Sequence, residues 1–138
     1  MDAQDFIDAA LEREQREGFD VLSAPEQTVC TISTVEFEVN LGGAFGWLHN
    51  SAGDRLPSLP HVFGRIGAVR LSQAAARLNS TLAMYCDPTD RLQRQEVLAH
   101  LPDDLRQNMT EFEAALAEED YGTLLEQYVV GDFKQNGA

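Results

Sequence analysis

Three histidines and two cysteines are the residues of this chain whose chemistry most often supports catalysis or metal binding. His49, His61 and His100 form no HExxH motif and no pair at helical i, i+4 spacing, so a zinc site would need ligands from distant segments. Cys30 and Cys86 have no CxxC or metal-like spacing, and no obvious neighbour would activate either thiol. We therefore expect no catalytic residue, no metal, no cofactor and two reduced structural thiols.

Glu36 is the one carboxylate that the pattern places on an apolar helix face, among residues such as Val29 and Ile32. A buried acid is costly unless it is paired or hydrogen-bonded. It could serve as a general acid or base, or it could accept N–H groups from the Asn40–Gly43 turn or from Trp47. We expect the structural role, with Glu36 at least half buried, because no partner for acid–base chemistry is visible.

The glycine-rich stretch EVNLGGAFGWLHNSAGD, residues 38–54, could bind an anion at a helix start or form a corner between two helices. It contains neither GxGxxG nor a P-loop lysine, so the corner is the better interpretation. Gly42 would adopt a positive φ at the end of the first helix, and Gly43 and Gly46 would permit close packing. Asn40 would cap the end of one helix or the start of the next, and Trp47 and Phe45 would fill the core. Asn50 also belongs to this structural motif, together with Glu36.

These residues must be positioned by helices, because apolar residues recur at helical spacing in most segments. Ser23 and Glu26 predict a capping box at the start of a helix, although the alternation around Val35–Val39 also permits a strand. We predict an all-α fold, a single compact domain of seven or eight short helices. The expected helices cover about 2–17, 24–40, 43–50, 59–66, 68–85, 90–100, the segment after Pro102, and 120–130.

The chain divides into an N-terminal helix and connection over 1–24, a core over 25–130, and a frayed tail over 131–138. No apolar run approaches the length that spans a membrane, and the acidic start MDAQDF lacks the basic region of a secretory signal. We therefore expect a cytoplasmic protein.

Net charge is the most unusual bulk property of the chain. It has 23 acidic and 10 basic residues, a net charge of −13, whereas small soluble domains usually carry about 2–8 charges in magnitude. Such a field repels nucleic acid and anionic membranes and attracts basic proteins. Direct nucleic-acid binding and membrane binding are thus not expected.

The acidic residues concentrate at the two ends: residues 1–26 hold eight acids and two bases, and residues 103–132 hold nine acids and one base. On a helix, Asp5, Asp8 and Glu12 rise about 4.5 and 6 Å apart, comparable with the roughly 3.4 Å charge spacing along one DNA strand. A solvated, solubilising surface is the alternative, with acids near residue 119 favouring a helix N-terminus. The candidate partner-binding residues are Asp5, Asp8, Glu12, Glu111, Glu113, Glu118, Glu119 and Asp120.

The stretch around the two glycines resembles the signature of the DNA-mimic-protein-like (DMP-type) family, a bacterial family whose members read E-x-E-V-N-N-G-G, an aromatic-rich helix, and N-x-x-G. The resemblance covers about residues 25–130 and includes Ile66-Gly67-Ala68 and the acidic C-terminal segment with Leu124–Tyr128. Leu41 and Gly46 depart from the usual Asn and Gln, which would weaken a site built on those polar side chains. The matching residues are Glu36, Glu38, Val39, Asn40, Gly42, Gly43, Trp47, Asn50 and Gly53.

The resemblance implies a helical fold, a very acidic surface and a non-enzymatic role, in which the protein imitates DNA and occupies a basic, DNA-binding partner such as a transcription factor. Two alternatives stay open: an immunity- or antitoxin-type inhibitor of a basic toxin, and an enzyme or small-ligand module with a pocket formed by Glu36, His49 and Trp47. The sequence does not name the partner or the oligomeric state, and a homodimer is among the options.

Overall fold

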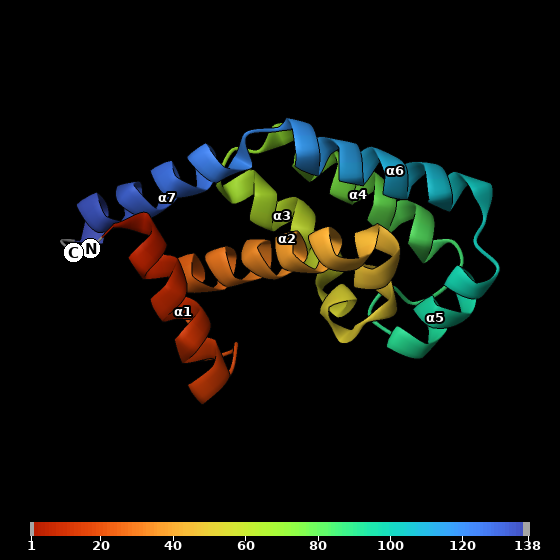
Figure 1. Cartoon of the computed structure of the whole chain (residues 1–138), viewed down its shortest axis with the longest axis horizontal. Helices are drawn as coiled ribbons and strands as arrows, with labels where there is room; N and C mark the ends of the chain where they lie inside the picture. The colour runs from red at the N-terminus through yellow and green to blue at the C-terminus, as the bar shows by residue number, and fades with distance from the viewer. Residues whose placement is uncertain (1, 137–138) are drawn as a thin grey trace.

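The structure, a computed structural model, describes residues 2–136, and most of them lie in helices. This region forms a single domain of seven α-helices and one 3-10 helix (η1) with no strand, which confirms the predicted all-α fold (Figure 1). None of these helices is long and apolar enough to cross a membrane. The elements are α1 Ala3–Glu17, α2 Ala24–His49, η1 Ser51–Ser58, α3 Leu59–Arg65, α4 Val69–Ala83, α5 Arg91–Ala99, α6 Asp103–Glu118 and α7 Tyr121–Asn136.

The long helix α2 begins at the predicted capping box. The Ser23 hydroxyl accepts the Glu26 backbone N–H at 3.2 Å, and the Glu26 carboxylate accepts the Ser23 N–H at 2.9 Å. The helix continues through the β-branched segment around Val35, because that side chain is buried together with Val29 and Ile32 on one face. Burial of this apolar face outweighs the weak strand preference of the individual residues.

Gly43 carries the change of direction that the sequence placed at a corner between two helices. Its φ of 69° and ψ of −178° produce a kink inside α2, and the helix continues from there to His49. The positive φ was expected at Gly42 but belongs to Gly43, where a side chain would be strained. Close packing at Gly46 was also wrong, since a Cβ added there would meet nothing within 4 Å.

Three further predictions for the glycine-rich stretch were tested by the structure. Trp47 is fully buried as expected, but Phe45 is 45% exposed and lies outside the core. Asn40 caps no helix end, because α2 runs through it and its side chain is exposed. Asn50 is the residue that ends α2, and its backbone N–H donates to Gly46 and Trp47.

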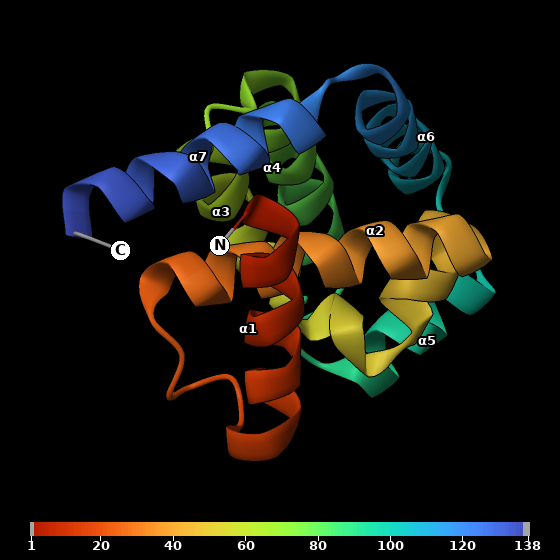
Figure 2. The same ribbon diagram turned by 60° about the vertical axis from the view of Figure 1, so that its left-hand side comes forward.

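The core forms around α2, which contacts α1, η1, α3, α5, α6 and α7 (Figures 1 and 2). α4 packs against α3 and α6 on the side away from α1. The Trp47 ring stacks on Phe112 of α6, with ring centroids 5.3 Å apart, and Phe63 of α3 lies 6.4 Å from the same phenyl ring. These contacts between large aromatic rings join α2, α3 and α6 into one apolar centre.

The C-terminal region differs from the frayed tail expected over 131–138. α7 continues to Asn136, and the Phe133 ring packs edge-to-face on Phe6 of α1 with centroids 5.5 Å apart. Residues 137–138 lie outside the described region. Because an apolar contact with α1 holds this last turn, α1 and α7 meet at one end of the molecule, and α5 lies at the other end (Figure 1).

The segment before α3 and the end of α4 also differ from the prediction. Residues 51–58, which received no element, form η1, and Leu56 within it is fully buried. The helix expected over 68–85 ends at Ala83, so Tyr85 lies beyond the end of α4, is 44% exposed, and donates its hydroxyl to Asp104 at 2.8 Å.

Candidate functional site

The acidic face of α1 projects away from the domain. The helix is capped by Asp2, whose carboxylate accepts the Asp5 N–H at 2.8 Å, and Gly18 ends it with a φ of 92°. Asp5, Asp8 and Glu12 are all exposed and follow one another at intervals of three and four residues, so they lie on one side of the helix. We call these three residues the α1 row.

The carboxylates of the α1 row are available to an external partner. Among residues 2–136, no hydrogen bond or ion pair reaches the carboxylates of Asp5 or Glu12, and Asp8 accepts one hydrogen bond, from Gln4 Nε2 at 2.9 Å. Arg13, the nearest base in sequence to Glu12, is committed elsewhere, since it pairs with Glu17 at 2.9 Å and with Glu26 at 2.8 Å. The row is therefore not neutralised by an ion pair with any base among the described residues.

The acids of the second predicted face, Glu111, Glu113, Glu118, Glu119 and Asp120, are used inside the domain; we call them the α6–α7 set. Glu119 accepts the backbone N–H groups of Arg70 at 3.2 Å and Leu71 at 2.9 Å, and Glu118 forms an ion pair with the Arg70 guanidinium. α4 starts after Ala68, which has no capping side chain. Glu119 therefore supplies the acceptor that the start of α4 lacks.

The other three acids of the α6–α7 set also have internal partners. Glu111 lies 3.6 Å from the Arg77 guanidinium, and Asp120 accepts the backbone N–H of Thr123 at 3.2 Å and its hydroxyl at 2.8 Å. Glu113 accepts the Ala44 N–H at 3.3 Å, directly after the kink in α2. A break in a helix frees N–H groups that lack a partner four residues earlier, and Glu113 satisfies one of them.

Arg94 is the charged residue that the sequence interpretation missed. It is fully buried, and its guanidinium donates to the backbone oxygens of Leu48 at 2.8 Å, Pro88 at 2.8 Å and Asn50 at 2.9 Å, and to the Asp54 carboxylate at 2.7 Å. The sequence feature that could have revealed its burial is the spacing of four residues between Arg94 and the buried Leu98, which places both on one face of α5. Arg94 therefore fastens α5 to the end of α2 and to η1.

Gly53 of the family signature lies against the same cluster. A Cβ added there would come within 2.9 Å of the Leu48 Cα and the Trp47 oxygen and 3.1 Å of the Arg94 guanidinium. Only glycine fits without a shift of the backbone. The N-x-x-G part of the signature is thus explained by close packing around Arg94, and it marks the fold.

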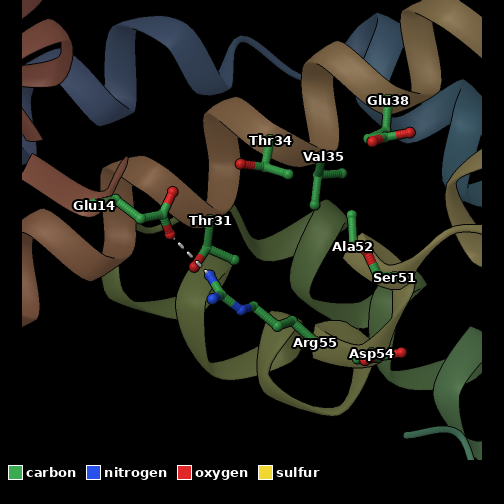
Figure 3. Close-up of a pocket in the computed structure, with 9 residues that line it drawn as sticks. All are labelled: Glu14, Thr31, Thr34, Val35, Glu38, Ser51, Ala52, Asp54 and Arg55. Carbon is green, nitrogen blue, oxygen red and sulfur yellow. Dashed lines mark hydrogen bonds and ion pairs between the residues drawn. The ribbon is translucent and has the colours of Figure 1, made fainter. Parts of the chain in front are cut away.

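A polar pocket of about 470 Å³ lies between α1, α2 and η1 (Figure 3). Its charged groups already have partners: Arg55 pairs with Glu14 at 3.4 Å and covers the Phe19 ring, with its Cζ 3.5 Å from the centroid, and Asp54 pairs with Arg94. Glu38 accepts a hydrogen bond from the Asn50 side chain at 3.1 Å. No group of three His, Cys, Asp or Glu residues within 2–136 is arranged to hold a metal ion.

The pocket proposed around Glu36, His49 and Trp47 is not formed by those three side chains. Trp47 is 0% exposed, and its indole N–H has no partner among the described residues. His49 is exposed and stacks on Phe45, with ring centroids 6.1 Å apart. Glu36 accepts the Tyr121 hydroxyl on the side of α7, whereas His49 lies at the last residue of α2, beyond the kink at Gly43.

Glu36 itself is exposed, so its predicted burial near Asn40–Gly43 was wrong. It lies at the edge of the apolar face of α2, toward α7, and its carboxylate accepts the hydroxyl of Tyr121. Partial burial raises the pKa of the Tyr121 hydroxyl above its usual value, and the neighbouring Glu36 carboxylate adds to that effect. The tyrosine therefore stays protonated and remains the donor.

The two cysteines are free thiols in a setting that keeps them protonated. Cys30 is fully buried, as predicted, and burial raises its pKa to about 12, helped by the nearby carboxylates of Glu14 and Glu26. Cys86 is half-buried, and burial raises its pKa as well. Since the thiolate is the reactive form, neither residue is suited to act as a nucleophile.

Comparison with known proteins identifies a family through the residues that form the fold, and the α1 row lies outside the match. A search of the curated proteins and of the solved structures found no significant match. The sequence model of the DMP19-like protein family matches residues 20–132, a range that contains the α2 kink, the Arg94 cluster and the α6–α7 set but not α1. Because this match covers well over half of the chain, the protein belongs to the DMP19-like protein family.

Proposed function

We propose that this protein is a non-enzymatic acidic binding protein that occupies the DNA-binding surface of a basic partner. The observation that carries the proposal is the α1 row, three exposed carboxylates on one side of a helix that form no ion pair with a base among the described residues. Membership in the DMP19-like family is consistent with a DNA-mimic role. The partner would be a transcription factor or nucleoid protein whose arginines and lysines meet carboxylates in place of phosphates.

Charge spacing supports the comparison with DNA. Carboxylates at intervals of three and four residues rise about 4.5 and 6 Å along a helix axis, while phosphates follow at roughly 3.4 Å along one strand. The row is sparser than a phosphate backbone, and the net charge of −13 adds a long-range negative field around it. Such a field steers a basic protein toward α1 and repels DNA itself.

A competition assay tests the proposal. DNA-binding proteins of the source organism are bound one at a time to a labelled duplex, and this protein is titrated into each complex. We expect displacement from at least one of them, with an affinity that falls steeply as salt is raised. A basic toxin that binds while every DNA complex stays intact would instead support the inhibitor alternative.

Matched charge-reversal variants locate the surface. Replacing Asp8 and Glu12 with Lys should weaken displacement by at least about tenfold, mainly through a slower association rate. Replacing Glu96 and Asp103 with Lys changes the net charge equally, but these exposed acids lie on α5 and at the start of α6, at the other end of the molecule (Figure 1). Equal losses in both variants would show that net charge alone acts, and would overturn the assignment to α1.

A further inference from the structure

A groove of about 620 Å³ lies where α1, α2 and α7 meet, at the end of the molecule that carries the α1 row (Figure 2). Its apolar floor includes Ile7, Phe37 and Leu125, one residue from each helix. A volume of this size suits a few side chains of a protein partner as well as a small ligand. The groove is separate from the polar pocket of Figure 3.

The groove opens onto an exposed apolar stripe on α2. Phe37 is 65% exposed, and it is followed one helical turn later, before the kink at Gly43, by Leu41, which is 75% exposed. Large apolar side chains scattered singly need no explanation, but two on one helix face beside a groove are typical of an interaction surface. Leu92 is as exposed as Leu41 and belongs to α5, which lies at the other end of the molecule (Figure 1), so it serves as a control.

Acids surround this apolar floor. The residues that line the groove include the carboxylates of Asp2, Glu36 and Glu126 and no lysine, arginine or histidine. Glu36 is held in place by the Tyr121 hydroxyl, while Glu126 has no hydrogen bond or ion pair within residues 2–136. The surface therefore combines an apolar centre with an uncompensated negative rim.

We propose that this groove and the adjoining stripe bind a cationic amphipathic helix of the protein partner. Apolar side chains at i, i+3, i+4 and i+7 of that helix would fill the floor beside Phe37, and its lysines and arginines would meet the acidic rim and the α1 row. Charge complementarity selects this occupant, because DNA, an anionic membrane and a second copy of this chain at −13 are all repelled. The inference rests on the proposed function, since it names the segment of the basic partner that binds.

This mode of binding predicts that the affinity for the helix has two separable contributions, one from charge contacts and one from burial of apolar surface. Contacts between exposed charges weaken as salt screens them, whereas burial of apolar surface does not. A partner that bound only to the acidic rim would lose nearly all affinity at high salt. A helix that also fills the groove should retain part of its affinity there.

The experiment uses two fluorescent peptides of about five helical turns, with identical composition rich in Leu, Lys and Arg. One has its leucines on a single helical face, and the other has the same residues in scrambled order. Binding to the full chain is measured by fluorescence anisotropy at low and high salt. We expect the amphipathic peptide to bind at least about tenfold more tightly than the scrambled one, and equal affinities would overturn the proposal.

Paired variants show which residues supply the apolar and the charged contributions to the affinity. Phe37→Ser should weaken binding by about tenfold at both salt concentrations, whereas Leu92→Ser should leave it unchanged. Glu36→Gln with Glu126→Gln should weaken binding at low salt and flatten the salt dependence, with Glu96→Gln as the control. Hydrogen exchange then locates the peptide, with increased protection expected at residues 33–37 and 121–126. If the Phe37 and Leu92 variants behave alike, or if protection appears elsewhere, the groove is not the site.

Other occupants and the proposed function are tested with the same variants. Self-association or binding to anionic lipid vesicles that depends on Phe37 would assign the groove to another occupant and overturn the proposal. If the peptide binds as expected but no DNA complex is displaced, the groove inference stands and the proposed function falls. If DNA is displaced and Phe37→Ser is as effective as the wild type, the proposed function stands and the groove inference falls.

Discussion

The α1 row and the α6–α7 set contain the same kind of residue and were grouped together on sequence, yet their carboxylates have different roles. Asp5, Asp8 and Glu12 face solvent and form no ion pair with a base among residues 2–136. In the α6–α7 set, Glu119 holds the start of α4 and Glu113 holds the N–H after the α2 kink. Charge in a sequence is therefore not the same as charge that a partner can use.

The family match adds to this comparison. The matched residues, 20–132, contain the α6–α7 set. The match begins after α1, which ends at Glu17. The acids of the α6–α7 set stabilise the helical arrangement, so the fold explains them without any partner. The proposed binding role of α1 is supported by the geometry of this chain and has to be tested on this chain.

The largest effect on stability is expected at Arg94, the base with the most internal partners. Arg94→Met leaves three backbone oxygens and Asp54 without their donor. Removal of one member of a buried charged cluster costs about 3–5 kcal/mol of unfolding free energy. Urea denaturation measures the loss.

The control for Arg94 is Arg16→Met. Arg16 is an exposed base on α1 that forms no hydrogen bond or ion pair with its side chain among the described residues. Its effect should stay within about 0.5 kcal/mol. Similar losses of unfolding free energy in the two variants would contradict the distinction between charges that have partners inside the domain and charges that do not.

Cys30 tests how burial and the nearby carboxylates of Glu14 and Glu26 affect a thiol in the core. Burial first, and then Glu14 and Glu26, raise its folded-state pKa from 9.0 to about 12. A raised pKa means that the stabilising contribution is complete below pH 9 and is lost as pH rises toward 12, because only the unfolded chain then gains the thiolate. Each pH unit in that window should cost about 1.4 kcal/mol.

The measurement is the unfolding free energy of wild type and Cys30→Ala across pH 8 to 12. The alanine variant loses some stability at every pH, so the informative quantity is the slope, which should be shallower than that of wild type. Parallel slopes would show that Cys30 does not titrate differently in the folded and unfolded chains.

Glu119→Ala should cost about 1–2 kcal/mol, the usual effect of losing a helix cap. The backbone N–H groups of Arg70 and Leu71 would then lose their acceptor. Thermal denaturation of this variant is compared with that of Glu126→Ala, in which an exposed acid of the next helix has no internal partner to lose. If both variants unfold at the same temperature, the capping role of Glu119 is wrong.

The smallest effect is expected from neutralising the α1 row. Asp5→Asn, Asp8→Asn and Glu12→Gln together should change the unfolding free energy by no more than about 0.5 kcal/mol, since these side chains are exposed and hold no other element. The sign should favour the variant at low salt, where self-repulsion is strongest. A loss as large as that of Glu119→Ala would mean that the row is structural after all.

The helical class, most helix bounds and the outward direction of the α1 row follow from the sequence, because their causes act over a few residues. The capping box of Ser23 and Glu26 involves partners three residues apart, and Asp5, Asp8 and Glu12 share a face because of the helical repeat alone. Errors arose where local signals compete: the extra helical turns of α7 are held by Phe133 against Phe6, a contact with the other end of the chain.

The roles of the individual charges were decided only in three dimensions, because their partners are distant in sequence. The acceptor of Tyr121 is 85 residues away at Glu36, Glu113 reaches 69 residues back to Ala44, and Arg94 reaches 46 residues back to Leu48. No periodicity encodes such pairs, since they depend on how α2 packs against α5, α6 and α7. The local pattern placed an acid row on α1, and the packing of the other helices determined which carboxylates would remain free to meet a partner.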